Sequence, residues 1–163
     1  ILPGRPVETW GFNGPHLGPT IRTARGDRVE MAVVNRLGER TTVHWHGMRL
    51  PATMDGGPHQ TIEPGATWRP HWTIDQPAAT SWYHPHPHEM TAEQVFRGMA
   101  GLLIVRSRTD PIPTAIEEKL LVISDLRLAA DGTIPVPERP GIGHEILWAR
   151  VEKATTWKES WGP

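Results

Sequence analysis

Short apolar runs separated by turn-forming residues constrain the fold of this chain more than any other feature. The 163 residues include 17 prolines and 16 glycines, and these residues interrupt the apolar runs before any of them reaches the length of a long helix. Strand-length runs separated by turns about every eight to twelve residues are typical of an antiparallel β-sandwich. We therefore expect an all-β fold, a Greek-key β-sandwich, with a short C-terminal extension.

Alternation and turn residues predict where the strands lie. Residues 17–37 predict two short strands around a turn at Gly26 and Asp27, with Val29, Met31 and Val33 on one face. Further strands are expected in residues 68–74 and 98–105, and one short helical turn in residues 91–97. Residues 81–88 must be extended, because each X-Pro step disfavours the α conformation in the residue before the proline.

The rest of the chain has a different character. We expect one domain in residues 1–107, a linker in residues 108–118, and in residues 119–163 either the incomplete start of a second domain or a rearranged tail. Within that last part, residues 120–126 resemble a strand, and apolar residues in 147–161 recur at helical spacing. A truncated product, a proteolytic fragment and a rearranged reading frame would each explain this pattern.

Charge and composition exclude several classes of function. The net charge is −1, and the sequence contains no basic block that could follow a phosphate backbone, which argues against a nucleic-acid partner. No apolar stretch approaches the roughly 20 residues that a membrane span requires, and the first residues lack the pattern of a secretion signal. The chain has no cysteine, so it can form no disulfide and supply no thiolate to a metal.

Two His-X-His pairs in extended backbone predict a metal site. His44 and His46 leave the same side of one predicted strand, while Val43 and Trp45 point to the other side. His84 and His86 repeat the spacing in the proline-containing segment. A single pair is weak evidence, but two pairs place four imidazoles within reach of a shared metal. Imidazole suits copper, zinc, iron or nickel better than calcium or magnesium, and spacing alone leaves that choice open.

The sequences that flank these histidines narrow the choice, because together they resemble the multicopper oxidases. Seven short motifs in residues 17–105 occur in the order expected for that family and are most similar to the bacterial copper-efflux (cuprous oxidase) group. They are GPTIR at 18–22, GDRV at 26–29, HWHG at 44–47, DGGP at 55–58, DQPAAT at 75–80, WYHPH at 82–86 and GMAGL at 98–102.

The resemblance implies a cupredoxin-like domain and a role for each matched histidine. His44 would bind the type 2 copper, and His46, His84 and His86 would bind the type 3 pair, which together form the trinuclear site that reduces dioxygen to water. Asp55 stands where the family keeps a carboxylate that assists proton delivery, and its alternative role is an Asx turn before two glycines. Copper is the implied cofactor, and the implied location is periplasmic or secreted.

The chain departs from the family in its ligand count. A complete oxidase contributes four more trinuclear histidines and a type 1 copper cysteine from its last domain, and the cysteine is absent here. The first hypothesis is therefore a copper-binding N-terminal domain with half of the trinuclear ligands. The remaining oxidase domains or another chain would complete the site, and the parent protein would oxidise cuprous ion or phenolics. The chain alone is not expected to be a complete enzyme.

Three other hypotheses remain. The chain could be a non-catalytic module that sequesters copper, or a copper-free scaffold of the same fold similar to the cell-division branch of the family. A zinc hydrolase ranks last, because the Asp-His step that usually accompanies His-X-His in such enzymes is missing. We expect His88 to lie at the surface or behind the ligands. Trp45, Trp68, Trp72 and Trp82 are expected to fill the core.

Overall fold

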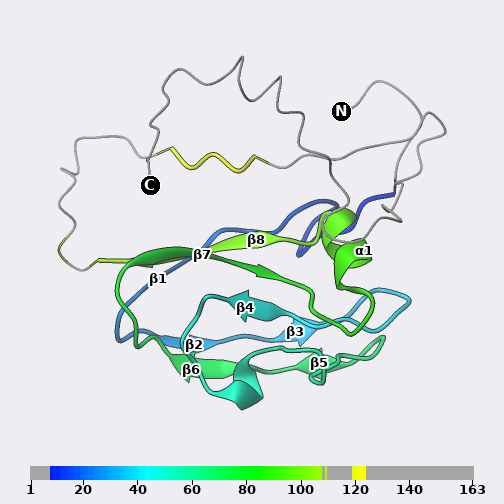
Figure 1. Cartoon of the computed structure of the whole chain (residues 1–163), viewed down its shortest axis with the longest axis horizontal. Coiled ribbons are helices and arrows are strands. Elements are labelled where there is room, and N and C mark those ends of the chain that lie inside the picture. Colours follow the sequence, from blue (N-terminus) through cyan, green and yellow to red (C-terminus); the bar gives the residue numbers. More distant parts are fainter. Residues whose placement is uncertain (1–7, 108, 110–118, 124–163) are drawn as a thin grey trace, which may run out of the picture.

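The computed structural model describes residues 8–107, 109 and 119–123 of the chain. In this part, short strands form two layers, and one short helix lies at one end of the sheets (Figure 1). The elements are β1 (Ile21–Ala24), β2 (Arg28–Glu30), β3 (Val33–Val34), β4 (His44–His46), η1 (Ala52–Met54), β5 (Thr67–Trp68), β6 (His71–Thr73), β7 (Ala79–His84), α1 (Thr91–Phe96) and β8 (Gly101–Arg106). The structure confirms the predicted cupredoxin-like β-fold.

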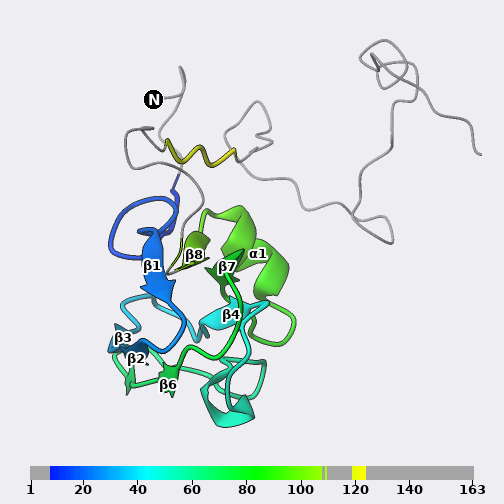
Figure 2. The same cartoon turned by 90° about the vertical axis from the view of Figure 1, so that its left-hand side faces the viewer.

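One layer is a four-stranded sheet in the order β1-β8-β7-β4. Strands β7 and β8 pair antiparallel, as do β4 and β7, whereas β1 joins the edge parallel to β8. The second layer contains two small antiparallel pairs, β2 with β6 and β3 with β5. Figure 2, turned to look from the side, shows β2, β3 and β6 stacked against the layer that contains β1, β7 and β8.

The two predicted strands around Gly26 and Asp27 are confirmed as β1 and β2, but they belong to different layers. The turn is stabilised by the Asp27 side chain, whose Oδ2 accepts the Ala24 N–H at 2.8 Å, and Gly26 has a φ of +92°. Glycine adopts this left-handed backbone without the steric penalty of a side chain. The turn thus carries the chain from one layer of the sandwich to the other.

Aromatic and branched side chains fill the space between the layers. The buried hydrophobic cluster consists of Val29, Val43, Trp45, Trp72, Ile74, Tyr83, Leu103 and Val105. Trp45 lies at its centre, with ring centroids 5.1 Å from Trp72, 5.8 Å from Tyr83 and 6.4 Å from Trp68. The side chains of Met31 and Val33 pack against the same cluster as Val29, which confirms the shared face predicted for them.

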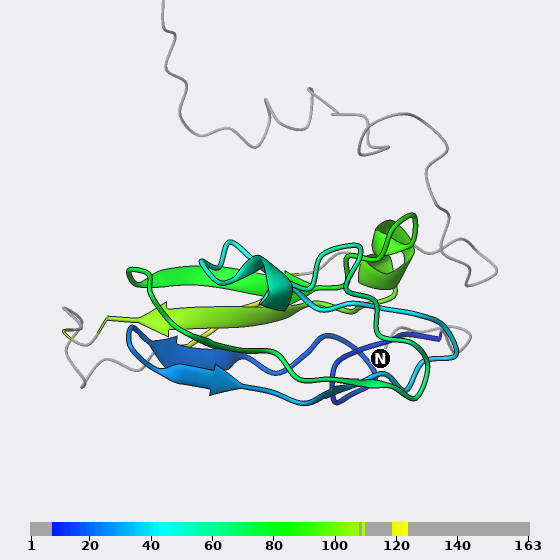
Figure 3. The same cartoon turned by 90° about the horizontal axis from the view of Figure 1, so that it is seen from below.

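The predicted helical turn is confirmed as α1, and Figure 3 shows it standing at one end of the long strands. No helix among the described residues has the length and apolar character that a membrane crossing would need. Residues 119–123 carry neither helix nor strand, and the rest of the strand predicted in residues 120–126 lies outside the described residues. Most of the predicted linker and the predicted C-terminal helix lie outside them as well.

Candidate metal centre

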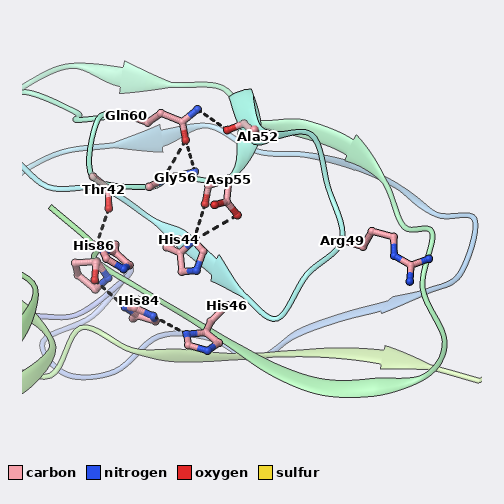
Figure 4. Close-up of polar contacts among 12 residues, drawn as sticks. Thr42, His44, His46, Arg49, Ala52, Asp55, Gly56, Gln60, His84 and His86 are labelled. Carbon is pink, nitrogen blue, oxygen red and sulfur yellow. Dashed lines mark hydrogen bonds and ion pairs between the residues drawn. The ribbon is translucent and has the colours of Figure 1, made fainter.

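Strands β4 and β7 bring the two His-X-His pairs together on one face of the four-stranded sheet. In their antiparallel register, His44 lies opposite His84 and His46 lies opposite Trp82. Because side chains alternate along a strand, Trp45 and Tyr83 turn into the core while the histidines leave the opposite face. His86 follows in the extended segment after β7. Figure 4 shows the four labelled imidazoles gathered between β4 and this segment.

The nitrogens of three of these rings converge. His46 Nδ1 lies 3.1 Å from His84 Nε2, and one ring nitrogen from each of His44, His46 and His84 lies within 4.8 Å of the others. The His86 ring adjoins this group, with its centroid 5.4 Å from that of His44 and 5.8 Å from that of His84. His84 is buried, His44 is partly buried and His46 is exposed, so the cluster opens towards solvent on the His46 side.

Backbone carbonyls fix the orientation of two of the rings. His44 Nδ1 lies 3.0 Å from the carbonyl oxygen of Asp55, and His84 Nδ1 lies 2.7 Å from that of Pro85. A carbonyl oxygen can only accept, so each Nδ1 carries the proton and donates it. Each Nε2 then carries a lone pair, and that of His84 accepts the Nδ1–H of His46 at 3.1 Å. Metal-binding histidines commonly have such a partner on their second ring nitrogen, which orients the ring and raises its basicity.

His86 is held through its backbone instead. Its N–H donates to the fully buried Thr42 Oγ1 at 2.7 Å, and Thr42 lies two residues before His44. The Nδ1 atom of His86 is buried and has no hydrogen-bond partner. A buried polar atom without a partner is uncommon and costs free energy, because it has lost its water without gaining a new contact. This atom would be satisfied by a bound metal or water.

Burial keeps the deepest histidine neutral. The pKa of His84 falls from 6.5 to about 4, chiefly because burial disfavours the charged imidazolium. The hydrogen bond to Pro85 opposes this shift, and the neighbouring rings of His44, His46 and His86 add to it. His84 is therefore uncharged at neutral pH, which is the protonation state that a metal ligand requires.

Asp55 lies beside the cluster, where the family resemblance implies a carboxylate. Its Oδ1 is 3.4 Å from His44 Nδ1, and its side chain is 40% exposed. Asp55 therefore contacts His44 through both its carboxylate and its carbonyl oxygen. The backbone N–H groups of Gly56 and Gly57 donate to Gln60 Oε1, so Gln60 supplies the acceptor that an Asx turn would have taken from Asp55. Sequence reasoning did not identify Gln60 or Thr42 as supports of the histidines.

Two other predictions concern neighbours of the cluster. His88 lies at the surface with its side chain 74% exposed, as expected. The prediction for Trp82 was wrong, because this residue leaves β7 on the histidine face and not on the core face. Its indole stacks on the His84 ring at 4.0 Å and on the His46 ring at 5.2 Å. Odd and even positions of one strand cannot both face the core, so Tyr83 occupies the core and Trp82 covers the site.

The residues present fit a metal that prefers nitrogen ligands. The cluster offers only imidazoles, the donor type that copper, zinc, iron and nickel accept. Two nitrogens that each lie about 2.0–2.1 Å from one ion are about 3 Å apart at ordinary bond angles. The separation of 3.1 Å between His46 Nδ1 and His84 Nε2 matches that spacing. The geometry alone does not distinguish among these metals.

Comparison with known proteins identifies the family of the chain. The family model for multicopper oxidases matches residues 1–110. The multicopper oxidase mco of Staphylococcus aureus is 48% identical over 97 residues, which cover 60% of this chain and 22% of that protein. The cell division protein FtsP of Escherichia coli is 40% identical over 148 residues, which cover 88% of this chain and 31% of that protein.

Solved structures of multicopper oxidases are also similar to this chain. The laccase-like multicopper oxidase CueO from Ochrobactrum sp. is 45% identical with a TM-score of 0.60, over 61% of this chain and 22% of that one. A laccase from Pediococcus acidilactici is 44% identical with a TM-score of 0.64, over 66% of this chain and 24% of that one. The 163 residues thus span between about a fifth and a third of the length of these relatives.

Proposed function

The chain belongs to the multicopper oxidase family, and from this premise we propose that its first cupredoxin domain supplies four histidine ligands to a copper cluster. His44 would hold the type 2 copper, and His46, His84 and His86 would hold the type 3 pair. The observation that carries the proposal is the convergence of ring nitrogens from His44, His46 and His84 within 4.8 Å. When bound, copper supplies the redox chemistry by which the family reduces dioxygen to water.

The surrounding residues prepare the rings for this role. The carbonyls of Asp55 and Pro85 hold the protons on Nδ1 of His44 and His84, so that each Nε2 is available to a metal. Thr42 fixes the backbone at His86, and burial keeps His84 neutral. Trp82 lies flat against two of the rings and excludes water from one side of the cluster. The ligands are thus positioned by the sandwich itself.

Asp55 is the candidate proton donor. Reduction of dioxygen consumes protons, and a carboxyl group beside the site can take them from solvent and pass them inward. The Asp55 side chain has access to solvent, since it is 40% exposed, and it also contacts the site, since its Oδ1 lies 3.4 Å from His44 Nδ1. Its role would be to hold and transfer a proton at this oxygen, while its carbonyl orients His44.

The complete reaction needs groups beyond these 163 residues. The chain contains no cysteine, and a type 1 copper needs a thiolate. We therefore assign the oxidation of cuprous ion or phenolics, coupled to dioxygen reduction, to a longer protein or to an assembly that supplies the missing ligands. By the same family resemblance, we place that protein in the periplasm or outside the cell. Cell fractionation with an antibody against this domain would test the location.

Copper titration of two matched variants tests the ligand assignment. The double variant His44→Ala, His46→Ala should lose most copper binding by calorimetry yet keep its fold, because both side chains lie on the face that is turned away from the core. His71→Ala is the control, since His71 is exposed on β6 in the other layer. This variant should bind copper like the unsubstituted chain. Unchanged copper stoichiometry in the double variant would refute the assignment.

A copper-free structural role is the second candidate. It is favoured by the similarity to the cell division protein FtsP, which covers 88% of this chain. The same titration separates the two functions, because a scaffold has no need for tight copper binding by the unsubstituted chain. Retention of all four matched histidines, with their supporting hydrogen bonds, favours the copper site. A copper-sequestering module would also bind the metal, and only oxidase assays on the completed assembly distinguish it.

A further inference from the structure

The side chain of Gln60 bridges the loop beside the histidine cluster (Figure 4). Its Oε1 accepts the N–H of Gly56 at 2.6 Å and the N–H of Gly57 at 3.1 Å. Its Nε2 donates to the Ala52 carbonyl at 3.0 Å, and its own backbone N–H donates to the Gly57 carbonyl at 3.0 Å. One side chain therefore ties together both ends of the segment that contains Asp55.

The N–H of Gly56 and the carbonyl of Asp55 belong to the same peptide group. The carbonyl accepts the Nδ1–H of His44 at 3.0 Å and also lies 3.4 Å from the backbone nitrogen of Trp45. Because the atoms of a peptide group lie in one plane, fixing its N–H also fixes the direction of its carbonyl. The contact from Gln60 to Gly56 is thus transmitted through one rigid group to the ring of His44.

Glycine permits this peptide orientation but does not enforce it. Gly56 has a φ of +72°, and a Cβ built there would lie 1.8 Å from the Val43 carbonyl oxygen, so a larger residue does not fit. A glycine has access to many other backbone conformations, and here two glycines follow each other. Another group must select the observed orientation. Gln60 Oε1 does so on the N–H side of the peptide, because it accepts the N–H groups of both glycines, whereas the Trp45 N–H contacts the Asp55 carbonyl only at 3.4 Å.

We propose that Gln60 is a positioning residue of the copper site, which holds the Asp55–Gly56 peptide so that its carbonyl keeps the proton of His44 on Nδ1. This inference rests on the function proposed above. With Nδ1 as donor, Nε2 keeps a lone pair that a metal can use. Hydrogen bonds in a chain polarise one another, so the Gln60 contact also strengthens the carbonyl as an acceptor. Loss of such a partner typically lowers metal affinity 10- to 100-fold.

Two substitutions at Gln60 test its acceptor oxygen and its donor nitrogen separately. Gln60→Glu keeps an oxygen acceptor for Gly56 and Gly57 but loses the donor to Ala52. Gln60→Lys keeps a donor and loses the acceptor, and the side chain is partly exposed, so the charge can reach water. If Gln60 only stabilises the loop, the two variants should weaken it alike. If Gln60 positions His44, only the lysine variant should change the imidazole.

Nitrogen NMR of the metal-free chain at pH 8 reads the proton position on His44 directly. In the unsubstituted chain and in Gln60→Glu, we expect one protonated nitrogen, Nδ1, and one bare nitrogen, Nε2. In Gln60→Lys, the two nitrogen shifts should move towards each other as both tautomers become populated, and copper affinity should fall about tenfold. Far-ultraviolet circular dichroism confirms that each variant is folded.

An unchanged pair of His44 nitrogen shifts in folded Gln60→Lys would overturn the inference, as would equal changes in both variants. If Gln60→Lys does not fold, displacement of the proton from Nδ1 in Gln60→Glu would overturn it in the same way. Failure of the proposed function has a different signature. The unsubstituted chain would then bind no copper, while the NMR comparison would still decide whether Gln60 controls the tautomer of His44.

Discussion

Adjacent residues of β7 point alternately to the histidine cluster and to the hydrophobic core. Trp82 and His84 leave one face of the strand, where His84 belongs to the histidine cluster and Trp82 stacks on it. Tyr83, between them, enters the core with 3% of its surface exposed. The Tyr83 hydroxyl donates to the Pro19 carbonyl at 2.7 Å, which anchors the segment before β1. The same strand thus shapes the candidate metal centre on one face and closes the sandwich on the other.

Tyr83 should make the stability of the domain depend on pH in the alkaline range. Burial raises its pKa from 10.0 to about 12, so the folded chain keeps a proton that the unfolded chain loses above pH 10. Stability from this residue is therefore complete below pH 10 and falls as the pH rises from 10 to 12, by at most about 2–3 kcal/mol. Urea unfolding between pH 9 and pH 12 measures this loss.

Tyr83→Phe is the matched control, because it removes the ionisable hydroxyl and keeps the ring. It should cost about 1 kcal/mol at neutral pH through the lost hydrogen bond, and its stability should fall less between pH 10 and 12. Tyr83 is the chain's one tyrosine, so phenolate absorbance reports it directly. A phenolate transition at pH 10 in the folded protein would contradict the expected burial effect.

Residue spacing alone predicted which histidines share a face, because alternation along a strand is a local property. His44, His46, His84 and Asp55 are all found in one neighbourhood, and His86 adjoins it. The supports of these residues were not predictable in the same way. Thr42 and Gln60 act through backbone groups whose direction depends on turn geometry, and a sequence pattern does not specify that direction.

Short elements in this domain depend on tertiary contacts for their stability. The six residues of α1 are too few to form a stable helix in isolation. Its fully buried Gln94 is bonded to Thr41 Oγ1 at 2.7 Å, Glu39 Oε1 at 2.8 Å and the Arg40 carbonyl at 2.9 Å. These bonds attach α1 to the segment that leads into β4, and hence to the strand that carries His44 and His46.

In strand β8, a glycine leaves room for an aromatic ring of the neighbouring strand. Gly101 pairs with Tyr83, and a Cβ at Gly101 would lie 2.2 Å from the Tyr83 ring carbon Cζ. Gly101→Ala should therefore destabilise the domain by about 1–3 kcal/mol, because the ring is buried and cannot move aside without strain. Thermal unfolding followed by circular dichroism gives the magnitude.

Gly38→Ala serves as the control for that measurement. No atom lies within 4 Å of a Cβ built at Gly38, so this change adds a methyl group without a clash. Its effect on stability should be within about 0.5 kcal/mol, as for ordinary surface substitutions. Equal destabilisation by the two alanines would show that the contact between Gly101 and Tyr83 does not limit the packing of β8.

The sequence predicted the existence of most elements and did not predict their pairing. The apolar run at residues 98–105 was identified as a buried strand, and β8 occupies most of it. Its parallel partner β1 lies about 80 residues earlier in the chain, and no local pattern encodes so distant a contact. The expected strand in residues 68–74 is divided into β5 and β6, which pair with different strands.

At the scale of the described molecule, the sandwich presents its histidines on the face of the four-stranded sheet that is turned away from the core, with His84 buried and His46 exposed. His46 is exposed, and the cluster opens to solvent on that side. Turn spacing was sufficient to predict the two-layer β-fold, since repeated short strands have few other stable packings. The relatives extend well beyond this domain, because the chain spans 22% of the mco protein and 31% of FtsP.

The absence of cysteine and the number of histidines determine how the isolated 163-residue chain should behave with copper. It should show no intense blue absorption, because that colour arises from copper bound to a cysteine thiolate and the chain has no cysteine. It should also fail to consume oxygen over many turnovers with cuprous ion or a phenol. In the proposed site, four histidines would be shared among three coppers and most coordination positions would be left to solvent, so the ions would not be held together firmly enough for repeated reduction to water.

An oxygen electrode with catalase present and no second protein added measures this outcome. Sustained linear consumption over many turnovers would contradict the expectation and show that the chain completes its own site. Because His46 lies exposed at the open side of the cluster, a second copy of the chain could then be the source of the missing ligands. Dilution decides the point: a rate that falls faster than the protein concentration requires ligands donated between chains, whereas a strictly proportional rate places the whole catalytic site within one chain.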